Sequence, residues 1–307
     1  MESETRSSLS GARRVAIVTG AGRGIGREHA LALAASGCDL VVNDLGTSGK
    51  GEGDSATPAE QVVAEIVATG GRAVANFADV ADWEATGDMI RQAVDTFGGL
   101  DIVVNNAGFL RDRMFVSQSE DEWDAVIRVH LKGHFCVARH AAEYWRSEAK
   151  AGRTRAARII NTSSGAGLQG SIAQSVYSAA KGGIASLTLV QAAELARYGV
   201  TANAIAPAAR TRMTEAVFAD MMKAPESGFD AMDPANISPL VVWLASRESE
   251  AVSGRVFEIA GGKINVSDGW RPGAAIEKQG RWDPAELGSA MSDLLRRANP
   301  SPRVYGS

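Results

Sequence analysis

Short hydrophobic runs alternate along the chain with longer segments in which hydrophobic residues recur at every third or fourth position. The short runs predict strands at residues 15–18, 40–44, 73–77, 101–104, 157–161, 201–205 and 255–259. The longer segments predict helices at residues 25–36, 59–68, 83–97, 120–148, 175–197 and 237–245. Strands that alternate with helices in this way predict a doubly wound, Rossmann-type α/β fold around a parallel seven-stranded sheet.

These elements form one domain with an addition at each end. A chain of 307 residues can bury a sizeable core, and we expect a single domain over residues 12–262. Residues 1–11 form a polar N-terminal tail, and residues 263–307 form a C-terminal extension that contains Trp270 and Trp282. We expect this extension either to wrap its own subunit or to cap the active site of a partner.

Two segments inside the domain interrupt the alternation. Residues 46–57 are rich in Gly and predict a surface loop. Residues 213–232 are rich in Met and Phe. This second segment predicts either a lid that repacks around apolar ligands, as thioether side chains allow, or an amphipathic helix packed on the core.

A glycine-rich turn separates the first predicted strand from the first predicted helix. Residues 19–26 read T-G-A-G-R-G-I-G. Glycines at such a turn let the backbone approach a pyrophosphate, which then binds at the helix N-terminus. The turn predicts a dinucleotide site that includes Gly20, Gly22, Arg23, Gly24, Ile25 and Gly26.

Asp44, at the end of the second predicted strand, bears on the choice of dinucleotide. A carboxylate there accepts hydrogen bonds from the ribose hydroxyls and repels a 2′-phosphate, which favours NAD over NADP. Arg23 argues the other way, since a cation in the turn can bind a 2′-phosphate. We expect NAD as the cofactor, because Asp44 acts directly on the ribose.

Tyr177 and Lys181 lie one turn apart on the predicted helix at residues 175–197. On a helix these two side chains share a face, with their Cβ atoms about 5–6 Å apart. A neighbouring ammonium favours the phenolate and can lower the pKa of the phenol from its usual value of about 10. The pair is therefore a candidate for acid–base chemistry near neutral pH.

Together these motifs resemble the short-chain dehydrogenase/reductase family over residues 12–262. The resemblance rests on the glycine turn, on N-N-A-G at residues 105–108, and on Ser164, Tyr177 and Lys181. It implies that Tyr177 is the general acid/base, that Ser164 holds the substrate oxygen, and that Lys181 binds the nicotinamide ribose and lowers the pKa of Tyr177. It further implies a cofactor site lined by Asp79, Val80, Asn106, Ala107 and Gly108.

Residues 42–46, 105–113, 128–133 and 205–213 carry a narrower resemblance. They are similar to the (3R)-hydroxyacyl-CoA dehydrogenase unit of peroxisomal multifunctional β-oxidation enzymes and to its stand-alone bacterial relatives. This resemblance implies oxidation of a 3-hydroxyacyl thioester with NAD. The wider family also implies a homodimer or homotetramer built on long helices, here residues 120–148 and 175–197.

Two positions depart from the pattern of the wider family. His130 stands where most members have an Asn that completes a proton relay, and it either holds the relay water itself or is a partly buried helix residue. The usual Pro-Gly is Pro207-Ala208 here, and Thr211 follows Pro207 one position early. By resemblance, Pro207 and Thr211 are expected beside the nicotinamide carboxamide.

Composition excludes several classes of function. The net charge of −4 gives no reason to expect nucleic acid or an anionic membrane as a partner. No run reaches the ~20 apolar residues of a membrane span, and the polar residues 1–14 do not form a secretory signal. We expect a cytoplasmic protein in which Cys38 and Cys136 are buried thiols, with no metal site.

The residues point to an NAD-dependent oxidoreductase that interconverts a secondary alcohol and a ketone, with a 3-hydroxyacyl-CoA as the first candidate substrate. Hydroxysteroids and other bulky alcohols are the main alternative, because the apolar residues 213–232 suit a sterol ring as well as an acyl chain. An NADPH-dependent ketoacyl reductase is disfavoured by Asp44. A dinucleotide-binding sensor or scaffold is a further alternative, although such a protein has no need of Tyr177.

Overall fold

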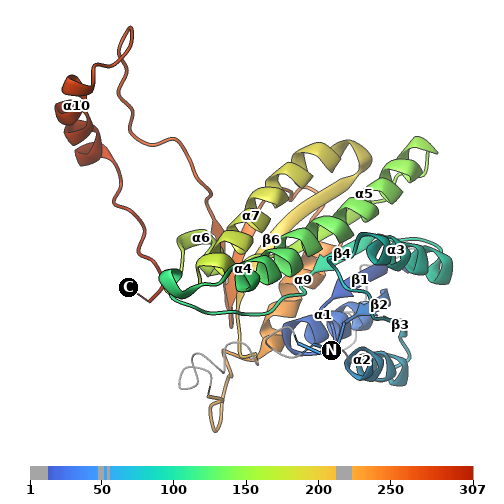
Figure 1. Ribbon diagram of the computed structural model, residues 1–307. Helices are drawn as coiled ribbons and strands as arrows, with labels where there is room; N and C mark the ends of the chain where they lie inside the picture. The colour runs from blue at the N-terminus through green and yellow to red at the C-terminus, as the bar shows by residue number, and fades with distance from the viewer. Residues whose placement is uncertain (1–12, 48–51, 54–55, 212–222, 307) are drawn as a thin grey trace, which may run out of the picture.

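A computed structural model describes residues 13–47, 52–53, 56–211 and 223–306 (Figure 1). An eight-stranded sheet forms its centre, with the strand order β3-β2-β1-β4-β5-β6-β7-β8. The strands are β1 (Val15–Thr19), β2 (Asp39–Asn43), β3 (Arg72–Asn76), β4 (Ile102–Asn105), β5 (Ala157–Thr162), β6 (Val200–Ala208), β7 (Val256–Ala260) and β8 (Lys263–Ser267). Strands β1 to β7 pair in parallel, which confirms the predicted sheet, and β8 pairs antiparallel with β7.

Strand β8 was missed by the sequence prediction, which ended the sheet at β7. It returns through a turn at Gly261 and Gly262, where Gly261 has a φ of +53°. Ile264 and Val266 on this edge strand are 52% and 53% exposed, so they contribute little to the core pattern along the chain. A Gly-Gly pair between two short runs is typical of a two-residue hairpin and is the feature that could have predicted β8.

Helices cover both faces of the sheet. The α-helices are α1 (Gly24–Ala35), α2 (Thr57–Ala68), α3 (Trp83–Phe97), α4 (Glu120–Ile127), α5 (Gly133–Lys150), α6 (Gly165–Gln169), α7 (Ser175–Leu195), α9 (Ser238–Ala245) and α10 (Pro284–Arg297). Short 3₁₀ helices lie at Phe115–Ser117, Ala196–Tyr198 and Pro234–Ile237. The predicted helix at residues 175–197 thus corresponds to α7 and the 3₁₀ helix that follows it.

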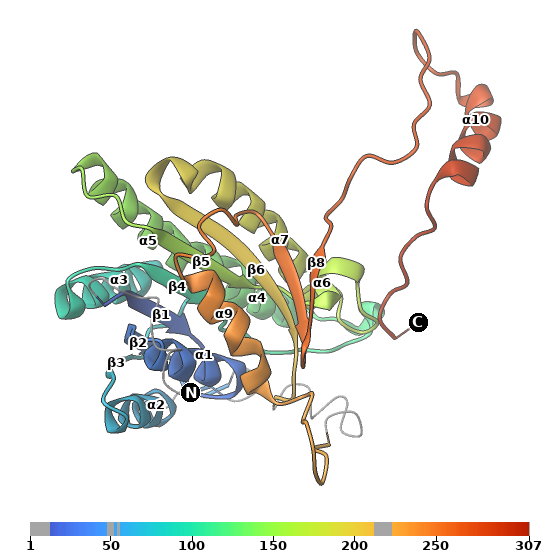
Figure 2. The ribbon, with the colours of Figure 1, turned by 180° about the vertical axis from the view of Figure 1, so that it is seen from behind.

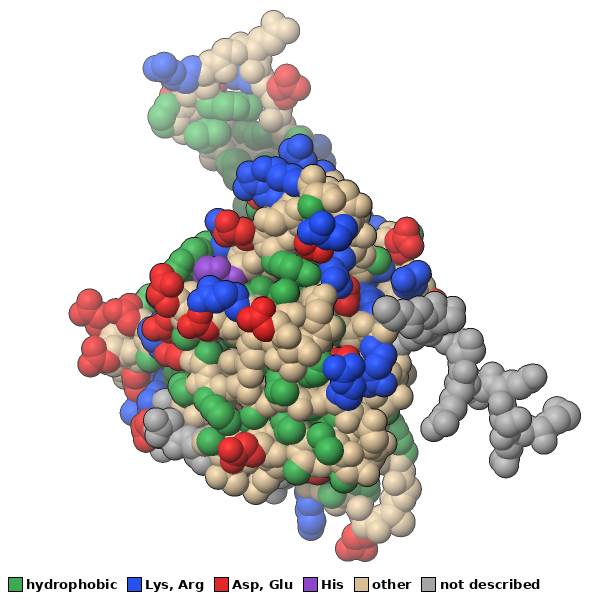
Figure 3. All heavy atoms as spheres, turned by 90° about the vertical axis from the view of Figure 1, so that its right-hand side faces the viewer, with side chains coloured by type: hydrophobic (Ala, Val, Ile, Leu, Met, Phe, Trp, Pro, Cys, Tyr) green, Lys and Arg blue, Asp and Glu red, His purple; other side chains and the backbone are tan. Residues whose placement is uncertain are grey.

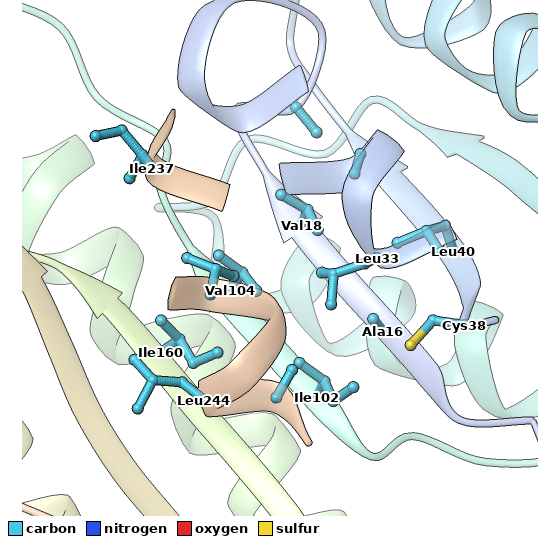
Figure 4. Close-up of a cluster of buried hydrophobic side chains, with 14 of the residues drawn as sticks. Ala16, Val18, Leu33, Cys38, Leu40, Ile102, Val104, Ile160, Ile237 and Leu244 are labelled. Atoms are coloured by element: carbon cyan, nitrogen blue, oxygen red, sulfur yellow. The ribbon is translucent and has the colours of Figure 1, made fainter. Parts of the chain in front are cut away.

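Two hydrophobic cores lie on opposite faces of the sheet. Successive side chains of a strand point to opposite faces, and Ala16 and Val18 of β1 accordingly pack in the core beneath α1, α2 and α9. Figure 4 shows this core, in which Leu33 and Leu244 from two helices meet the sheet. Val15 and Ile17 pack in the other core with side chains of α3 and α5. This is the doubly wound arrangement that the sequence predicts.

The predicted helix at residues 120–148 is helical throughout, but it is not α-helical along its whole length. It begins at Ser119, whose side chain forms a capping box with Glu122. A π-helical segment, Arg128–Lys132, then separates α4 from α5. A π segment adds one residue to a turn, and such insertions are frequent at functional sites. Here it places His130 in the protein interior, where the side chain is 1% exposed.

The C-terminal extension leaves the body of the protein after β8 and returns to it near α6. Figures 1 and 2 show α10 at the far end of this excursion, well separated from the sheet. No residue of α10 is buried. In Figure 3 the same lobe stands apart at the top, while positive and negative side chains are interspersed over the visible face of the body.

The described residues include both cysteines of the chain and most of its predicted helices. Cys38 and Cys136 are buried free thiols, as predicted. Among the helices of the described ranges, none has the length and apolar character needed to cross a membrane. The loop predicted at residues 46–57 and the segment at residues 213–232 fall partly outside the described residues, and residues 223–232 contain no helix.

Candidate active site

A cavity of about 440 Å³ opens at the carboxyl edge of the sheet. In doubly wound sheets this edge is where ligands bind. The predicted residues that line the cavity are Gly20, Arg23, Gly24, Ile25, Gly26, Asp44, Asp79, Val80, Asn106, Ala107, Gly108, His130, Tyr177, Lys181, Pro207 and Thr211. Gly22 and Ser164 do not line the cavity. Gly22 contacts the lining residue Asp44, and Ser164 contacts the lining residue Tyr177.

The glycine turn between β1 and α1 has no room for side chains at its centre. Gly20 and Gly24 have φ angles of +63° and +53°, which residues with a Cβ rarely adopt. A Cβ on Gly26 would lie 2.1 Å from the carbonyl oxygen of Gly20. Arg23 is the N-cap of α1 and its side chain makes no capping hydrogen bond. The first N–H groups of α1 therefore remain available to an anion, and the turn fits a pyrophosphate.

Asp44 lies directly against the glycine turn. One carboxylate oxygen accepts a hydrogen bond from the N–H of Gly22 at 2.7 Å, and the other accepts one from the N–H of Gly46 at 2.7 Å. A carboxylate has further lone pairs, so it can still accept hydrogen bonds from ribose hydroxyls. Arg23 is exposed and donates to the carbonyl oxygen of Thr47 at 3.4 Å.

Asn106 fastens the loop after β4 to the glycine turn. Its side-chain amide donates to the carbonyl oxygens of Thr19 at 3.1 Å and Gly20 at 3.2 Å. The Thr19 hydroxyl in turn accepts from the backbone N–H groups of Asn106 at 3.0 Å and Ala107 at 3.2 Å. The side chain of Asn106 thus shapes the cavity by holding the turn in place.

Asp79 and Val80, which the resemblance assigns to the cofactor site, lie in the loop after β3 and line the cavity. Asp79 accepts from the N–H of Ala81 at 2.9 Å and from the guanidinium of Arg128 at 2.6 Å. Val80 is buried against Gly133, on which a Cβ would lie 2.7 Å from a Val80 methyl group. The ion pair between Asp79 and Arg128 ties this loop to the π-helical segment.

Ser164, Tyr177 and Lys181 meet at the carboxyl end of β5. Ser164 is the N-cap of α6, accepts from the N–H of Ala166 at 3.2 Å, and is hydrogen-bonded to Tyr177. The Nζ of Lys181 lies 5.6 Å from the centroid of the Tyr177 ring and donates to the carbonyl oxygen of Thr162 at 2.7 Å. The hydroxyl pair and the ammonium thus form one compact group.

Burial controls the charge of this group. We expected the ammonium of Lys181 to lower the pKa of Tyr177. Instead, burial raises the pKa of Tyr177 to about 12, against the opposing effect of the hydrogen bond with Ser164. Burial also lowers the pKa of Lys181 to about 7. The direction of the shift is therefore opposite to the expected one, because exclusion of water favours the neutral form of both groups.

His130 packs beneath Tyr177. The two rings meet edge to face with centroids 5.3 Å apart. The Nε2 atom of His130 lies 2.7 Å from the carbonyl oxygen and 3.0 Å from the N–H of Phe109. Burial lowers the pKa of His130 to about 3, so the ring is neutral. Its Nδ1 atom is buried and has no hydrogen-bond partner among the described residues. Its part in a proton relay stays a prediction.

The comparisons with known proteins agree with this geometry. A family model described as short chain dehydrogenase matches residues 14–222. The chain belongs to the short-chain dehydrogenase family. It is 57% identical to a short chain dehydrogenase from Mycobacterium avium of known crystal structure, with a TM-score of 0.86 and coverage of 96% of this chain and 98% of that chain. It is accordingly an oxidoreductase that acts on a CH–OH group with a nicotinamide dinucleotide, NAD(P).

Two curated relatives are similar over most of the chain. Hydroxyacyl-CoA dehydrogenase ChsB1 of Mycobacterium tuberculosis is 43% identical over 96% of this chain and 92% of its own length. Peroxisomal multifunctional enzyme type 2 of Mus musculus is 44% identical over 82% of this chain. The chain spans only 32% of the mouse enzyme, so the two share one unit of that larger protein.

The short-chain dehydrogenase site also contains two residues that the sequence reasoning missed. The carboxylate of Asp112 accepts hydrogen bonds from the side-chain amide of Gln174 at 3.1 and 3.2 Å. Its negative charge helps to raise the pKa of Tyr177. Gln174 follows Ala173, which has a φ of +62° and is the one non-glycine residue with a positive φ in the described ranges. Asp112 lies in the segment that carries the narrower resemblance, but nothing in its local pattern predicts this contact.

No metal site emerges from the described part of the family fold. His130 and His134 lie one turn apart, but within those residues no group of three His, Cys, Asp or Glu side chains is arranged to hold a metal ion. Both rings are buried, and burial lowers the pKa of His134 well below its usual value.

Proposed function

We propose that the protein is an NAD-dependent dehydrogenase that oxidises the hydroxyl group of a 3-hydroxyacyl-CoA. The observation that carries the proposal is the position of Ser164, Tyr177 and Lys181 beside a cavity lined by the glycine turn and Asp44. The name of one curated relative, hydroxyacyl-CoA dehydrogenase ChsB1, supports the thioester class.

The preference for NAD rests on Asp44. Its carboxylate is held by the N–H groups of Gly22 and Gly46 and lies where a ribose would follow a pyrophosphate bound at the turn. A phosphate on that ribose would meet a fixed negative charge. Arg23 is exposed and donates to the carbonyl oxygen of Thr47, so its guanidinium is engaged by a loop carbonyl.

In the oxidative direction, Tyr177 accepts the hydroxyl proton of the substrate and Ser164 donates a hydrogen bond to the same oxygen. Ionisation of Tyr177 is favoured by the positive charge that Lys181 and an oxidised nicotinamide ring bring to a site shielded from water. The cofactor supplies the redox chemistry by accepting a hydride from the carbinol carbon. The products are a ketone, NADH and a proton.

His130 and Lys181 then serve the return of the proton to water. Lys181 is bonded to the carbonyl oxygen of Thr162, and the unpartnered Nδ1 atom of His130 lies in the same interior region. A buried polar atom of this kind is ordinarily satisfied by a water molecule. We place His130 as the residue that holds such a water in place of the usual Asn.

The substrate class is tested by following NADH formation with a panel of (3R)- and (3S)-hydroxyacyl-CoAs and hydroxysteroids, each with NAD and with NADP. The proposal predicts selective oxidation of the (3R) thioesters with NAD. Turnover of hydroxysteroids alone would overturn the thioester assignment and leave the dehydrogenase chemistry in place. A preference for NADP would overturn the role given to Asp44.

A further inference from the structure

The C-terminal end of the chain lies beside the loop that connects α6 to α7. Both Figure 1 and Figure 2 place the C-terminus near α6. The N–H of Tyr305 donates to the carbonyl oxygen of Gly170 at 3.1 Å, and the N–H of Ile172 donates to the carbonyl oxygen of Tyr305 at 3.0 Å. These bonds form a short parallel bridge between Ser171 and Tyr305. The extension is thus held to the body at its far end as well as through β8.

The side chain of Tyr305 reaches the residue that follows Ser164. A Cβ on Gly165 would lie 2.8 Å from both Cε2 and the hydroxyl oxygen of Tyr305. Gly165 is not among the glycines with a positive φ. The ring of Tyr305 therefore rests directly on the backbone of Gly165, and a Cβ at position 165 would displace the ring.

The ring is also accessible on its other side. Tyr305 is 46% exposed, and the neighbouring apolar side chains of Ile172 and Val304 are 46% and 39% exposed. Ser164 lies outside the lining of the cofactor cavity. Tyr305 is also outside that lining, so a carbinol bound to Ser164 with its substituents turned towards the start of α6 would meet this partly exposed apolar surface.

We propose that Tyr305 forms one wall of the substrate site and favours substrates with a long or bulky apolar group on the carbinol carbon. The inference rests on the proposed oxidation of 3-hydroxyacyl thioesters. An aromatic ring suits this role because it offers a large apolar area at a small cost in conformational freedom. The C-terminal extension is then the element that carries a specificity residue back to the catalytic serine.

The test compares the full-length protein with five variants, four single and one double, on a short and a long substrate, 3-hydroxybutyryl-CoA and 3-hydroxydecanoyl-CoA, with NAD. We expect Tyr305→Ala to lower the ratio of kcat/KM for the long over the short substrate about tenfold, which corresponds to ~1.4 kcal/mol. Tyr305→Phe keeps the ring and should retain most of the preference. Leu295→Ala, on the exposed surface of α10 in the same extension, is the matched control.

Gly165→Ala changes the other partner in the contact between Gly165 and the Tyr305 ring. The added Cβ would displace the Tyr305 ring, so this variant should lower the ratio in the same way. In the background of Tyr305→Ala, the Gly165→Ala change should lower it no further, because the two residues act through one contact. Such non-additivity would show that both substitutions act on the contact between Gly165 and Tyr305, whereas two independent losses of stability would add.

Three outcomes overturn the proposal. One is an unaltered ratio in Tyr305→Ala, and another is an equal loss on both substrates, which would assign the residue a structural role alone. A third is a fully additive double variant. If the wild type oxidises no thioester, the proposed function fails instead. The same variants are then compared on a hydroxysteroid and 2-butanol, where Tyr305→Ala must still lower the ratio for the bulky alcohol.

Discussion

The cofactor side and the substrate side of the active site hold their residues in different ways. On the cofactor side, Asn106 and Asp44 bind the backbone of the glycine turn, and these contacts join neighbouring strand ends. On the substrate side, Gln174 meets Asp112, while Tyr305 meets Gly165 from the other end of the chain. The first arrangement leaves no room for a Cβ at Gly26, whereas the second joins segments that lie far apart in the sequence. The cofactor side is therefore held by contacts within one edge of the sheet, whereas the substrate side depends on contacts between segments that are distant in the sequence.

The largest effect is expected from the glycine turn. Gly26→Ala would place a Cβ 2.1 Å from the carbonyl oxygen of Gly20. The turn cannot relax because Asn106 holds it, so we expect binding of NADH to fall by at least ~100-fold, or ~2.7 kcal/mol. Titration of NADH fluorescence measures this. Gly288→Ala, in α10 with no neighbouring atom within 4 Å of the added Cβ, is the control and should bind normally.

Lys181 lies between the cofactor side and the substrate side of the active site. We expect its buried ammonium to lower the stability of the folded protein and to raise the rate of catalysis. Lys181→Met should lower turnover by roughly 10²-fold or more, the usual contribution of acid–base catalysis. It should also raise the melting temperature of the cofactor-free protein, because it removes a buried ammonium. A variant with unchanged turnover, or one that melts below the wild type at pH 6.5, would contradict the role assigned to this lysine.

The higher stability expected of the Lys181→Met variant should depend on pH. Burial lowers the pKa of Lys181 to about 7 from an ordinary value of 10.5, so the unfolded chain binds the proton more tightly than the folded one. The folded wild type therefore loses stability as pH falls from 10.5 towards 7 and bears the full cost below 7. The melting-temperature difference between Lys181→Met and the wild type should be largest below pH 7 and shrink towards pH 10.

On the cofactor side, Asp44→Asn should have a smaller effect than Gly26→Ala and should change the choice between NAD and NADP. The amide keeps the size of the side chain and removes its charge. We expect the ratio of kcat/KM with NAD over NADP to fall about tenfold, or ~1.4 kcal/mol. If the wild type instead favours NADP and Arg23→Ala abolishes that preference, Arg23 and not Asp44 selects the dinucleotide.

The smallest effect is expected on the substrate side. Asp112→Asn keeps an oxygen that can accept from Gln174 but removes a negative charge that raises the pKa of Tyr177. The pH at which oxidation reaches half of its maximum should therefore move to a lower value. The pH profile of kcat/KM measures this, with Asp121→Asn on the exposed surface of α4 as the control. A shift to higher pH would contradict the assignment.

The contrast between the two sides also explains what the sequence could predict. The glycine turn, Asp44 and the Tyr177–Lys181 pair are short motifs whose spacing reflects their geometry. The π segment was missed because one added residue barely alters the hydrophobic period of a helix. The contacts of Asp112 and Tyr305 join distant segments, and no local pattern records them. The raised pKa of Tyr177 depends on burial, which only the packed fold determines.

The most direct test of the central claim is a comparison of Tyr177→Phe with the wild type on a (3R)-hydroxyacyl-CoA and NAD. The variant loses only the hydroxyl that we assign as the acid/base. We predict that kcat falls by roughly 10²–10⁴-fold, while NADH binds with an affinity close to that of the wild type. Turnover that stays within about tenfold of the wild type would contradict the claim, because it is too large for an enzyme that lacks its acid/base.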